Sequence, residues 1–355
     1  MKASRTMLLS VLLAAPMLLG AFSAQAADRD NTDVIVLKNG DRVTGEIEQL
    51  EYGLLRLATD DMGTINIEWS AIASIDSKYV FDVQVVGGLR HSGLIGTSDD
   101  GSELVIRDEG SGRSVAVADV VRIEELETGF WQRLSGSMSM GLNYTKSTGI
   151  RTSNINISSA YQGDKTKATL DISAAETSSS DTDKSERENI TSTVQFQRER
   201  PSFVMLLNTL ERNDELGIDA RLTTGAGLAR YFGQDEDSEI MLFAGAVANQ
   251  EWTDSGGDGV TLEDDSQQSL EGALGATWRI FRFGDPDVSL ASSAFLYPSL
   301  TESGRHRGNL DVSLRREIIS DLFFDISFYE SYDSDPPSGG QTTDYGFVTS
   351  LGYKF

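Results

Sequence analysis

The clearest candidates for binding chemistry lie in an acidic, glycine-rich stretch of the second half of the chain. Its carboxylates are those of Asp254, Asp258, Glu263, Asp264 and Asp265. Calcium takes about six to eight oxygen ligands, which such a stretch can offer. Divalent cations could also bridge it to lipopolysaccharide phosphates. A solvated loop that keeps the surface hydrophilic fits the same composition better, so we predict no resident metal and no cofactor.

Residues for covalent or acid–base catalysis are scarce. The chain has no cysteine, which excludes a thiol nucleophile and cysteine-bound zinc. Of its two histidines, His91 follows a predicted turn and should be a surface residue. His306 lies between Arg305 and Arg307, and no G-x-S-x-G motif accompanies it. We therefore predict that the protein is not an enzyme, with a hydrolase built on His306 as the minor alternative.

A second group of charged residues alternates with apolar ones in strand-like segments of the C-terminal part. We predict that these residues face the lumen of a β-barrel: Asp171, Arg221, Glu271, Arg279, Asp311, Arg315 and Asp325. Opposite charges that lose water together should form pairs. The group carries both signs, so it could line a narrow polar channel or fill the lumen.

The elements that would position these residues are short amphipathic strands. From about residue 130 onward, segments of about ten residues alternate apolar and polar side chains between turns. We count about twelve such segments, which predicts an antiparallel transmembrane β-barrel over residues 127–355. The segment from Phe203 to Leu210 is apolar on both faces, so its register stays open. The longest connections, 177–188, 253–266 and 331–342, are acidic and are predicted to lie outside the cell.

Aromatic residues gather near the ends of these strands, as in the girdles of membrane barrels. We place Trp131, Phe203, Trp278, Phe281 and Phe355 at the periplasmic interface, and Tyr144, Trp252, Tyr297, Tyr329 and Tyr345 at the outer one. The alternating C-terminal residues resemble the signal that the barrel-assembly machinery recognises, which makes that machinery a predicted partner. They are Phe347, Leu351, Tyr353 and Phe355.

The first 26 residues have the layout of a secretory signal peptide. Lys2 and Arg5 precede an apolar run over 7–21, and Ala24-Gln25-Ala26 forms a cleavage site. Export and a barrel together predict a Gram-negative outer-membrane protein with its N-terminal part in the periplasm. Its partners would be outer-membrane lipid and lipopolysaccharide. The net charge of −25 disfavours a nucleic-acid partner.

Residues 27–126 contain an internal repeat, with copies at about 34–77 and 83–125. At an offset of 48 residues, Gly40 aligns with Gly88, Arg42 with Arg90, and Gly45 with Gly93. Each copy resembles a small SH3-like or Sm-like β-unit, and the two should pack together because each is small. Asn39-Gly40 predicts a type I′ turn, and Gly45 a tight bend. For Arg42 and Arg90 a solvated strand edge is favoured over a partner contact.

The segment from about Trp131 to Phe355 resembles the salt-induced outer-membrane protein family, also called domain of unknown function 481, and the N-terminal repeat is an addition to it. The motifs that carry this resemblance are Gly141-Leu142-Asn143-Tyr144, the Ser/Thr-rich alternating strands and Gly352-Tyr353-Lys354-Phe355. The resemblance implies an outer-membrane barrel and supplies no catalytic or binding residues. Two functions stay open: a narrow porin-like channel for small polar solutes or ions, or a non-conducting structural, stress-related barrel that presents a periplasmic partner-binding domain.

Overall fold

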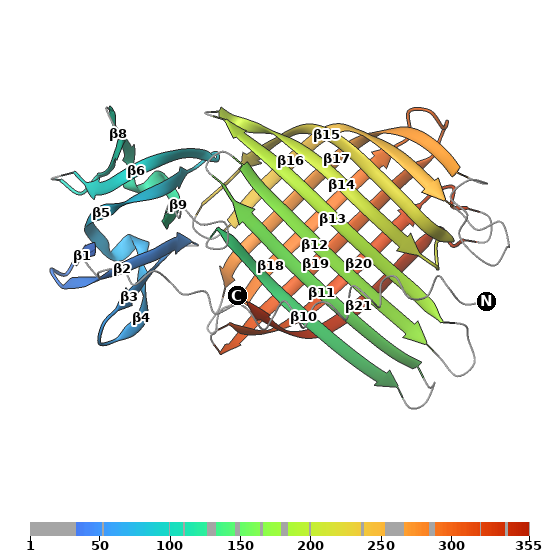
Figure 1. Ribbon diagram of the computed structural model, residues 1–355, viewed down its shortest axis with the longest axis horizontal. Helices are drawn as coiled ribbons and strands as arrows, with labels where there is room; N and C mark the ends of the chain where they lie inside the picture. Colours follow the sequence, from blue (N-terminus) through green and yellow to red (C-terminus); the bar gives the residue numbers. More distant parts are fainter. Residues whose placement is uncertain are drawn as a thin grey trace.

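The computed structural model describes most of the chain as β-structure in two units (Figure 1). The described residues are 33–51, 53–98, 100–108, 111–125, 133–145, 150–163, 166–178, 184–198, 200–235, 238–252, 266–283, 288–319, 321–337 and 340–354. The predicted signal peptide, residues 1–26, lies outside these ranges. No helix within them has the length and apolar composition of a membrane span.

The N-terminal unit is one nine-stranded antiparallel sheet with two short 3-10 helices. Strands β4-β3-β2-β1-β5-β6-β7-β8 follow one another in the sheet, and β9 pairs with β2 and β5. The elements are β1 (Asp33–Leu37), β2 (Arg42–Glu51), β3 (Leu54–Thr59), β4 (Gly63–Glu68), η1 (Trp69–Ala71), β5 (Ile72–Val85), β6 (Leu89–Thr97), β7 (Glu103–Asp108), β8 (Ser111–Ala116), η2 (Val117–Asp119) and β9 (Val120–Glu125).

The two sequence copies have the same internal pairing, and β5 belongs to both. Its first half pairs with β1 (Ile75 opposite Ile35), and its second half pairs with β9 (Val83 opposite Ile123). The copies also exchange edges, because β2 of the first pairs with β9 of the second and β5 pairs with β6. The repeat therefore forms one intertwined sheet around one apolar core, and not two separate barrels. The likeness to SH3-like or Sm-like barrels stays a prediction.

A hydrogen bond between the copies joins equivalent positions. The indole Nε1 of Trp69 donates to the backbone oxygen of Val117, 48 residues later, at 3.0 Å. Trp69 is buried in the shared core. A buried indole N–H needs an acceptor, so this contact orients the two 3-10 helices toward each other.

Three glycines test the predictions about turns in the repeat. Gly40 has a φ of +93°, but Asn39 does not lie in the left-handed region, which a type I′ turn requires. The predicted turn type is therefore wrong, because the Oδ1 of Asn39 instead accepts a hydrogen bond from the backbone N–H of Asp41 at 3.0 Å. The predicted tight bend at Gly45 stays a prediction. Gly45 and Gly93 both lie close to facing backbone, where a Cβ would be 2.3 Å and 2.6 Å from carbonyl oxygens.

The repeated arginines have different environments. Arg42 is exposed, whereas the side chain of Arg90 is only 6% exposed and forms ion pairs with Asp82 and, at 3.3 Å, with Glu124. The solvated-edge prediction is therefore wrong for Arg90, because the intertwined sheet brings acidic residues of β5 and β9 beside it. The ring of His91 lies 2.8 Å from Arg113 Nη1, among exposed side chains.

The second unit is a closed antiparallel barrel of twelve strands, which confirms the predicted fold class. Pairing of the first strand with the last, with Met138 opposite Tyr353, closes the ring. The strands are β10 (Leu134–Thr145), β11 (Ile150–Gln162), β12 (Thr166–Ser178), β13 (Ser185–Arg198), β14 (Arg200–Asn213), β15 (Ile218–Phe232), β16 (Ser238–Trp252), β17 (Ser266–Phe283), β18 (Val288–Pro298), β19 (His306–Ile319), β20 (Leu322–Asp333) and β21 (Thr343–Lys354).

The N-terminal unit lies beside one end of this barrel, which we call the near end (Figure 1). The opposite end, where β10 finishes, is the far end. The three long acidic connections of the sequence join β12 to β13, β16 to β17 and β20 to β21, so all three belong to the far end. Parts of each connection lie outside the described residues.

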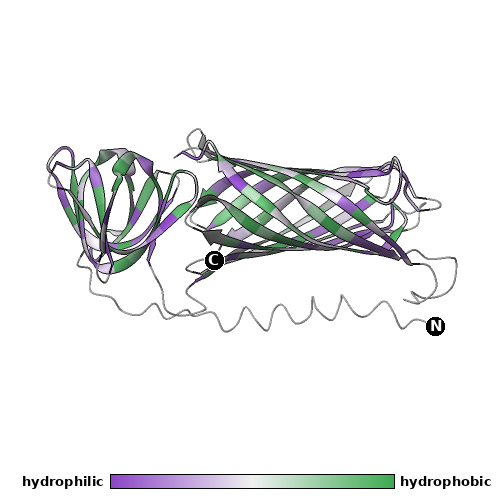
Figure 2. Ribbon diagram, turned by 90° about the horizontal axis from the view of Figure 1, so that it is seen from above, coloured by the Kyte–Doolittle hydropathy of each residue, from purple (hydrophilic) through white to green (hydrophobic). Residues whose placement is uncertain are grey.

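The barrel wall carries many exposed apolar side chains on its outer face. Figure 2 shows that hydrophobic and hydrophilic residues share the same barrel strands. Leu142 is 85% exposed, Phe347 73% and Leu228 62%. Leu351 and Tyr353 of the predicted assembly signal are also exposed on this face, and Phe355 lies outside the described residues. This face is the reverse of a soluble protein's surface, where large apolar patches are rare.

The aromatic-girdle prediction is wrong for Phe203, Tyr297 and Tyr329. Phe203 and Tyr297 are buried in an apolar cluster inside the barrel, and Tyr329 lies under an inward guanidinium. Trp278 and Tyr345 are exposed on the outer face. Trp252 is partly exposed, and the structure does not describe the side chains of the remaining candidates Trp131, Tyr144, Phe281 and Phe355.

Inside the wall, aromatic rings cover glycines of neighbouring strands. A Cβ on Gly275 would lie 2.4 Å from the ring of Phe295, and one on Gly352 would lie 2.3 Å from Phe323. The missing side chains let the rings lie flat against the wall, as in the aromatic rescue of glycine in sheets.

The close approaches at Gly45 and Gly93 give a test of the intertwined sheet. Gly45→Ala and Gly93→Ala should each destabilise the N-terminal unit by about 1–3 kcal/mol, because the added carbon meets fixed backbone. Pulse proteolysis of the full-length protein across a urea series measures this. Gly112→Ala is the control, since nothing lies within 4 Å of its Cβ position. Equal urea midpoints for all three variants would contradict this fold.

Candidate functional site: the barrel lumen

The residues predicted to face the lumen alternate with the exposed apolar residues of the same strands, which places them on the inner side of the wall. Asp171 and Asp311 are exposed to the interior, whereas Arg221, Glu271 and Asp325 are buried. The remaining two form ion pairs with neighbouring strands: Arg279 with Glu239 at 3.1 Å and Arg315 with Asp325 at 3.6 Å.

Arg221 is the centre of a buried ion-pair cluster toward the far end. Its guanidinium lies 2.6 Å from Glu251, 2.8 Å from Asp333 and 3.5 Å from Glu211. Arg305 binds two of the same carboxylates, Asp333 at 2.8 Å and Glu251 at 3.1 Å. We call these five residues the far-end cluster. Two arginines and three carboxylates nearly balance in charge, which buried ions require.

The far-end cluster crosses the lumen. Arg221 belongs to β15 and Asp333 to β20, which are five strands apart around a ring of twelve. Side chains on such distant strands can meet only through the interior. The hydrogen bond from Arg221 Nη2 to Asp333 Oδ2 at 2.8 Å therefore spans the barrel from wall to wall.

A second set of contacts crosses beside the first. Arg187 of β13 donates to Ser331 Oγ of β20 at 3.0 Å, and its guanidinium lies 3.8 Å from the ring centre of Tyr329. Asn213 at the end of β14 donates to Asp344 of β21 at 2.9 Å. These bonds connect the same two walls at separate points, so the crossing is a layer and not a single bridge.

Backbone segments extend this layer beyond the strands. The N–H of Gln341 donates to the backbone oxygen of Glu215 at 2.8 Å, which joins the β14–β15 and β20–β21 connections. Leu216 and Ile218 beside this contact are each only 1% exposed. The far end is therefore crossed by ion pairs and by two connections that meet over it.

The pKa of Arg305, in the β18–β19 connection, is shifted by these contacts. Burial alone would lower it, but the hydrogen bond to Asp333 and the negative charge of Glu251 raise the pKa above its ordinary value. Arg305 therefore stays charged over the whole physiological range, and pH within that range should not open this part of the far-end cluster.

A bidentate pair, Arg307 with Glu271, adds to the buried charges of this region. Arg307 Nη2 lies 2.6 Å from Glu271 Oε2, and its Nε donates to Oε1 at 3.0 Å. Glu271 is fully buried. Such fork-to-carboxylate pairs are among the strongest charge-assisted contacts in proteins.

Sequence reasoning identified only part of this site. It placed Arg221 and Glu271 in the lumen but treated Arg305 and Arg307 only as neighbours of His306. It also missed Arg187, Glu211, Glu251, Asp333 and Asp344. These residues continue the alternation of inward-facing positions near the ends of the strands. The signal was missed because strand ends cannot be placed accurately from sequence.

Part of the inner face of the wall formed by β14 to β18 is apolar. Its buried side chains form one cluster, here called the inner apolar cluster: Phe203, Met205, Leu207, Ala229, Tyr231, Met241, Phe243, Val247, Ala273 and Tyr297. The open register of the segment 203–210 is thereby explained, since one face packs inside and the other lies outside. The opposite wall is polar, with pairs such as Thr169–Thr193 at 2.6 Å and Ser158–Asp171 at 2.6 Å.

The near end lies against the N-terminal unit. The turn before β6 approaches the inner apolar cluster, since a Cβ on Gly88 would lie 3.0 Å from the ring of Tyr231. Arg122 and Glu124 of β9 lie within electrostatic range of Lys167 in β12. The unit is therefore beside the opening opposite the far-end cluster.

The described residues add no support for the predicted metal and catalytic sites. The calcium candidates Asp254, Asp258, Glu263, Asp264 and Asp265 lie outside the described residues. Within the described ranges, no cluster of three or more acidic or histidine side chains could hold a metal. The Nδ1 of His306 lies 3.1 Å from the backbone oxygen of Gly304, and its ring packs near Tyr332.

The far-end cluster should make Arg221 important for stability. Arg221→Ala leaves three carboxylates buried with less positive charge and should cost about 3–5 kcal/mol. Urea unfolding in lipid vesicles, followed by tryptophan fluorescence, measures the loss. The matched control is Arg279→Ala, whose side chain is 48% exposed, with an expected cost below about 1 kcal/mol. Similar losses for both variants would count against a buried far-end cluster.

Comparison with known proteins gives one family and several similar structures. No curated protein matches the chain. Similar solved structures include the NanC porin (9% identity, 62% of this chain and 96% of that chain covered, TM-score 0.34) and the translocator domain of autotransporter NalP from Neisseria meningitidis (12%, 62%, 87%, 0.34). A Pseudomonas aeruginosa FadL homologue is also similar (10%, 92%, 86%, 0.28).

The family evidence comes from sequence alone. Residues 127–355, more than half of the chain, match the family model described as "Protein of unknown function, DUF481". The matched range is the one for which the resemblance was predicted, whereas the salt-related name stays a prediction. The chain belongs to the DUF481 family of proteins of unknown function.

Proposed function

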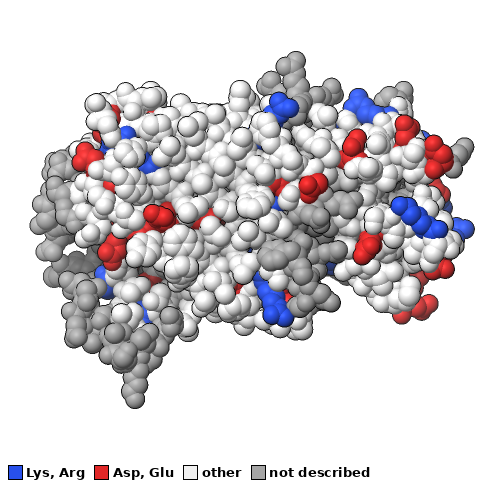
Figure 3. Space-filling model, turned by 180° about the vertical axis from the view of Figure 1, so that it is seen from behind, with Lys and Arg blue, Asp and Glu red and all other residues white. Residues whose placement is uncertain are grey.

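We propose that this protein is a non-conducting outer-membrane β-barrel that holds its N-terminal unit at the periplasmic face. Membrane insertion is supported by the closed strand ring and its apolar outer face. In the view of Figure 3, the middle of the barrel wall is largely free of charged side chains. The predicted signal peptide and C-terminal assembly pattern support export and insertion by the assembly machinery.

The orientation follows from the connections. The near end carries short connections and the N-terminal unit, and the far end carries the long acidic ones. Bacterial barrels have short periplasmic turns and longer outer loops, so the near end is assigned to the periplasm. The acidic far end would then lie among the lipopolysaccharide phosphates, where divalent cations could bridge like charges.

The single observation that carries the non-conducting role is the contact of Arg221 with Asp333 across the lumen. A polar solute could pass only by separating buried ion pairs, and leaving one of these charges unpaired is costly. The narrow-channel alternative would need the far-end cluster to open. The far-end cluster lies at the end of the lumen opposite the N-terminal unit, so it does not close the periplasmic end.

The N-terminal unit is then the part available for a partner in the periplasm. Residues 33–125 contain eight basic and eighteen acidic side chains, a net charge of −10. Complementary charge speeds and orients association. We therefore propose a periplasmic protein partner with a basic binding surface.

Planar bilayer recording tests the non-conducting role. The wild-type protein should give no steady conductance, because the far-end layer occupies the lumen. The double variant Arg187→Ala, Arg221→Ala should give conductance steps, since it removes the two strand arginines that reach β20 from β13 and β15. Arg279→Ala should remain silent, because its pair with Glu239 joins adjacent strands.

Each variant must first show the heat-modifiable gel mobility of a folded barrel, so that silence cannot come from misfolding. Regular, ion-selective steps from the folded wild-type protein would overturn the non-conducting role and favour the channel. A double variant that is folded and silent would show that the far-end cluster is not what blocks passage.

A further inference from the structure

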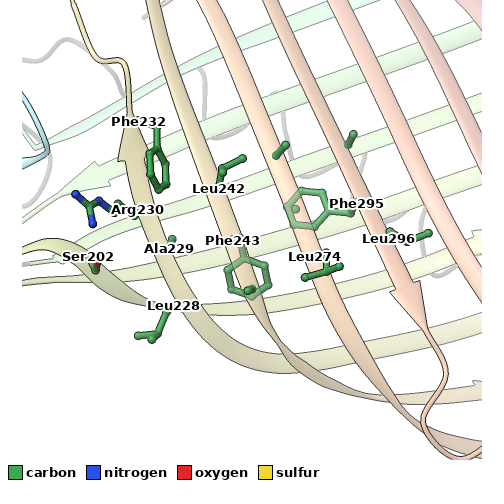
Figure 4. A pocket seen from close by; sticks show the side chains of 14 residues that line it. Ser202, Leu228, Ala229, Arg230, Phe232, Leu242, Phe243, Leu274, Phe295 and Leu296 are labelled. Atoms are coloured by element: carbon green, nitrogen blue, oxygen red, sulfur yellow. The ribbon is translucent and has the colours of Figure 1, made fainter.

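An apolar groove with a volume of about 590 Å³ lies on the outer face of the wall formed by β14 to β18 (Figure 4). Small residues line its middle: Ala244, Gly275, Ala276 and Ala294. Leucines surround them: Leu228, Leu242, Leu274 and Leu296. Each of these leucines is at least 44% exposed, so the groove opens outward.

The strand register explains why a depression forms here. Ala244 lies between Leu228 and Leu274 in one row of paired residues. In the next row, Leu242 is followed by Ala276 and Ala294. Three alanines therefore occupy positions that neighbour leucines in these two rows. Their short side chains leave a depression in the outer face that extends across several strands.

The near-end side of the groove carries a positive charge. Arg230 is paired with Leu242 of the neighbouring strand, and Ser202 of the next strand is paired with Arg230. Both residues therefore lie at the edge of the apolar rows. The guanidinium of Arg230 lies 5.2 Å from the ring centre of Phe232 (Figure 4). Arg230 is exposed, and no carboxylate of the described residues lies within ion-pair distance of it.

An arginine next to an apolar surface, without an acidic partner on the described chain, matches one ligand chemistry. A phospholipid has an acyl chain that fits an apolar groove and a phosphate that a guanidinium binds with two parallel hydrogen bonds. The arginine is at the near end, where the inner leaflet has its headgroups if the proposed orientation holds. Lipopolysaccharide headgroups would lie at the other end.

We propose that this groove binds one phospholipid of the inner leaflet, with an acyl chain over Ala244, Ala276 and Ala294 and its phosphate on Arg230. Ser202 lies beside Arg230 and can donate a hydrogen bond to the same phosphate. This inference rests on the proposed membrane location, and it adds a specific lipid site to it.

Native mass spectrometry of the folded, full-length protein in detergent tests the site. With added phosphatidylglycerol, the wild-type protein should retain one lipid. Arg230→Gln should weaken retention about fivefold, the effect of one basic residue on an anionic lipid. Ala276→Leu and Ala294→Leu should weaken it as well, because each fills the groove. Arg316→Gln is the matched control, since it changes another exposed arginine of the barrel that does not line the groove.

Neutral diacylglycerol separates the two parts of the ligand. Diacylglycerol should bind the wild-type protein more weakly than phosphatidylglycerol does. It should bind Arg230→Gln as well as it binds the wild-type protein, because it has no phosphate for the arginine to contact. The site is refuted if Arg230→Gln or both leucine variants retain the phospholipid as the wild type does. It is also refuted if the groove variants abolish a dimer, because the groove would then bind a second copy of the chain.

Vesicle flotation and heat-modifiable mobility distinguish this failure from that of the proposed function. A protein that does not enter vesicles would overturn the membrane location itself. A protein that inserts and folds but retains no lipid would overturn only the phospholipid site. The two leucine variants are independent, so one that fails to fold leaves the test intact.

Discussion

Closure of the strand ring is the constraint on which the rest of this structure depends. In lipid, every backbone N–H and C=O must find a partner within the protein, and a sheet achieves this only when its edges meet. Here β10 and β21 meet through residues such as Met138 and Tyr353. Closure assigns alternate residues to lipid and to lumen, so the outer face becomes apolar and the remaining polar groups are collected inside.

The collected polar groups cannot stay unpaired where water is excluded. The protein meets this requirement differently on its two inner walls. Between β14 and β18 many inward side chains form an apolar cluster, whereas charged residues of the far-end cluster lie toward the ends of the same strands and between β11 and β13 hydroxyl groups pair with each other and with Asp171. Where charges are most deeply buried, Arg221 and Arg305 reach carboxylates of distant strands. The same pairing that satisfies these charges also crosses the lumen.

In the N-terminal unit, too, strand edges are paired within the protein. Each sequence copy is too small for a large core of its own, and β5 runs through both. The copies exchange strand edges, which gives one shared core containing Trp69 and Phe81. A buried arginine at one repeat position and an exposed one at the other show that the copies have diverged in their contacts while keeping the same pairing.

The sequence by itself determined what depends on local periodicity: the twelve alternating strands, their closure in a barrel and the repeat at 48 residues. It assigned Arg221 and Glu271 to the lumen for the same reason. Only the tertiary structure decided which inward residues meet, because Arg221 and Asp333 are 112 positions apart and join through the ring's curvature. It also decided the exchange of edges between the repeats and the inward direction of Phe203 and Tyr297, since alternation gives a side chain's face but not its partner.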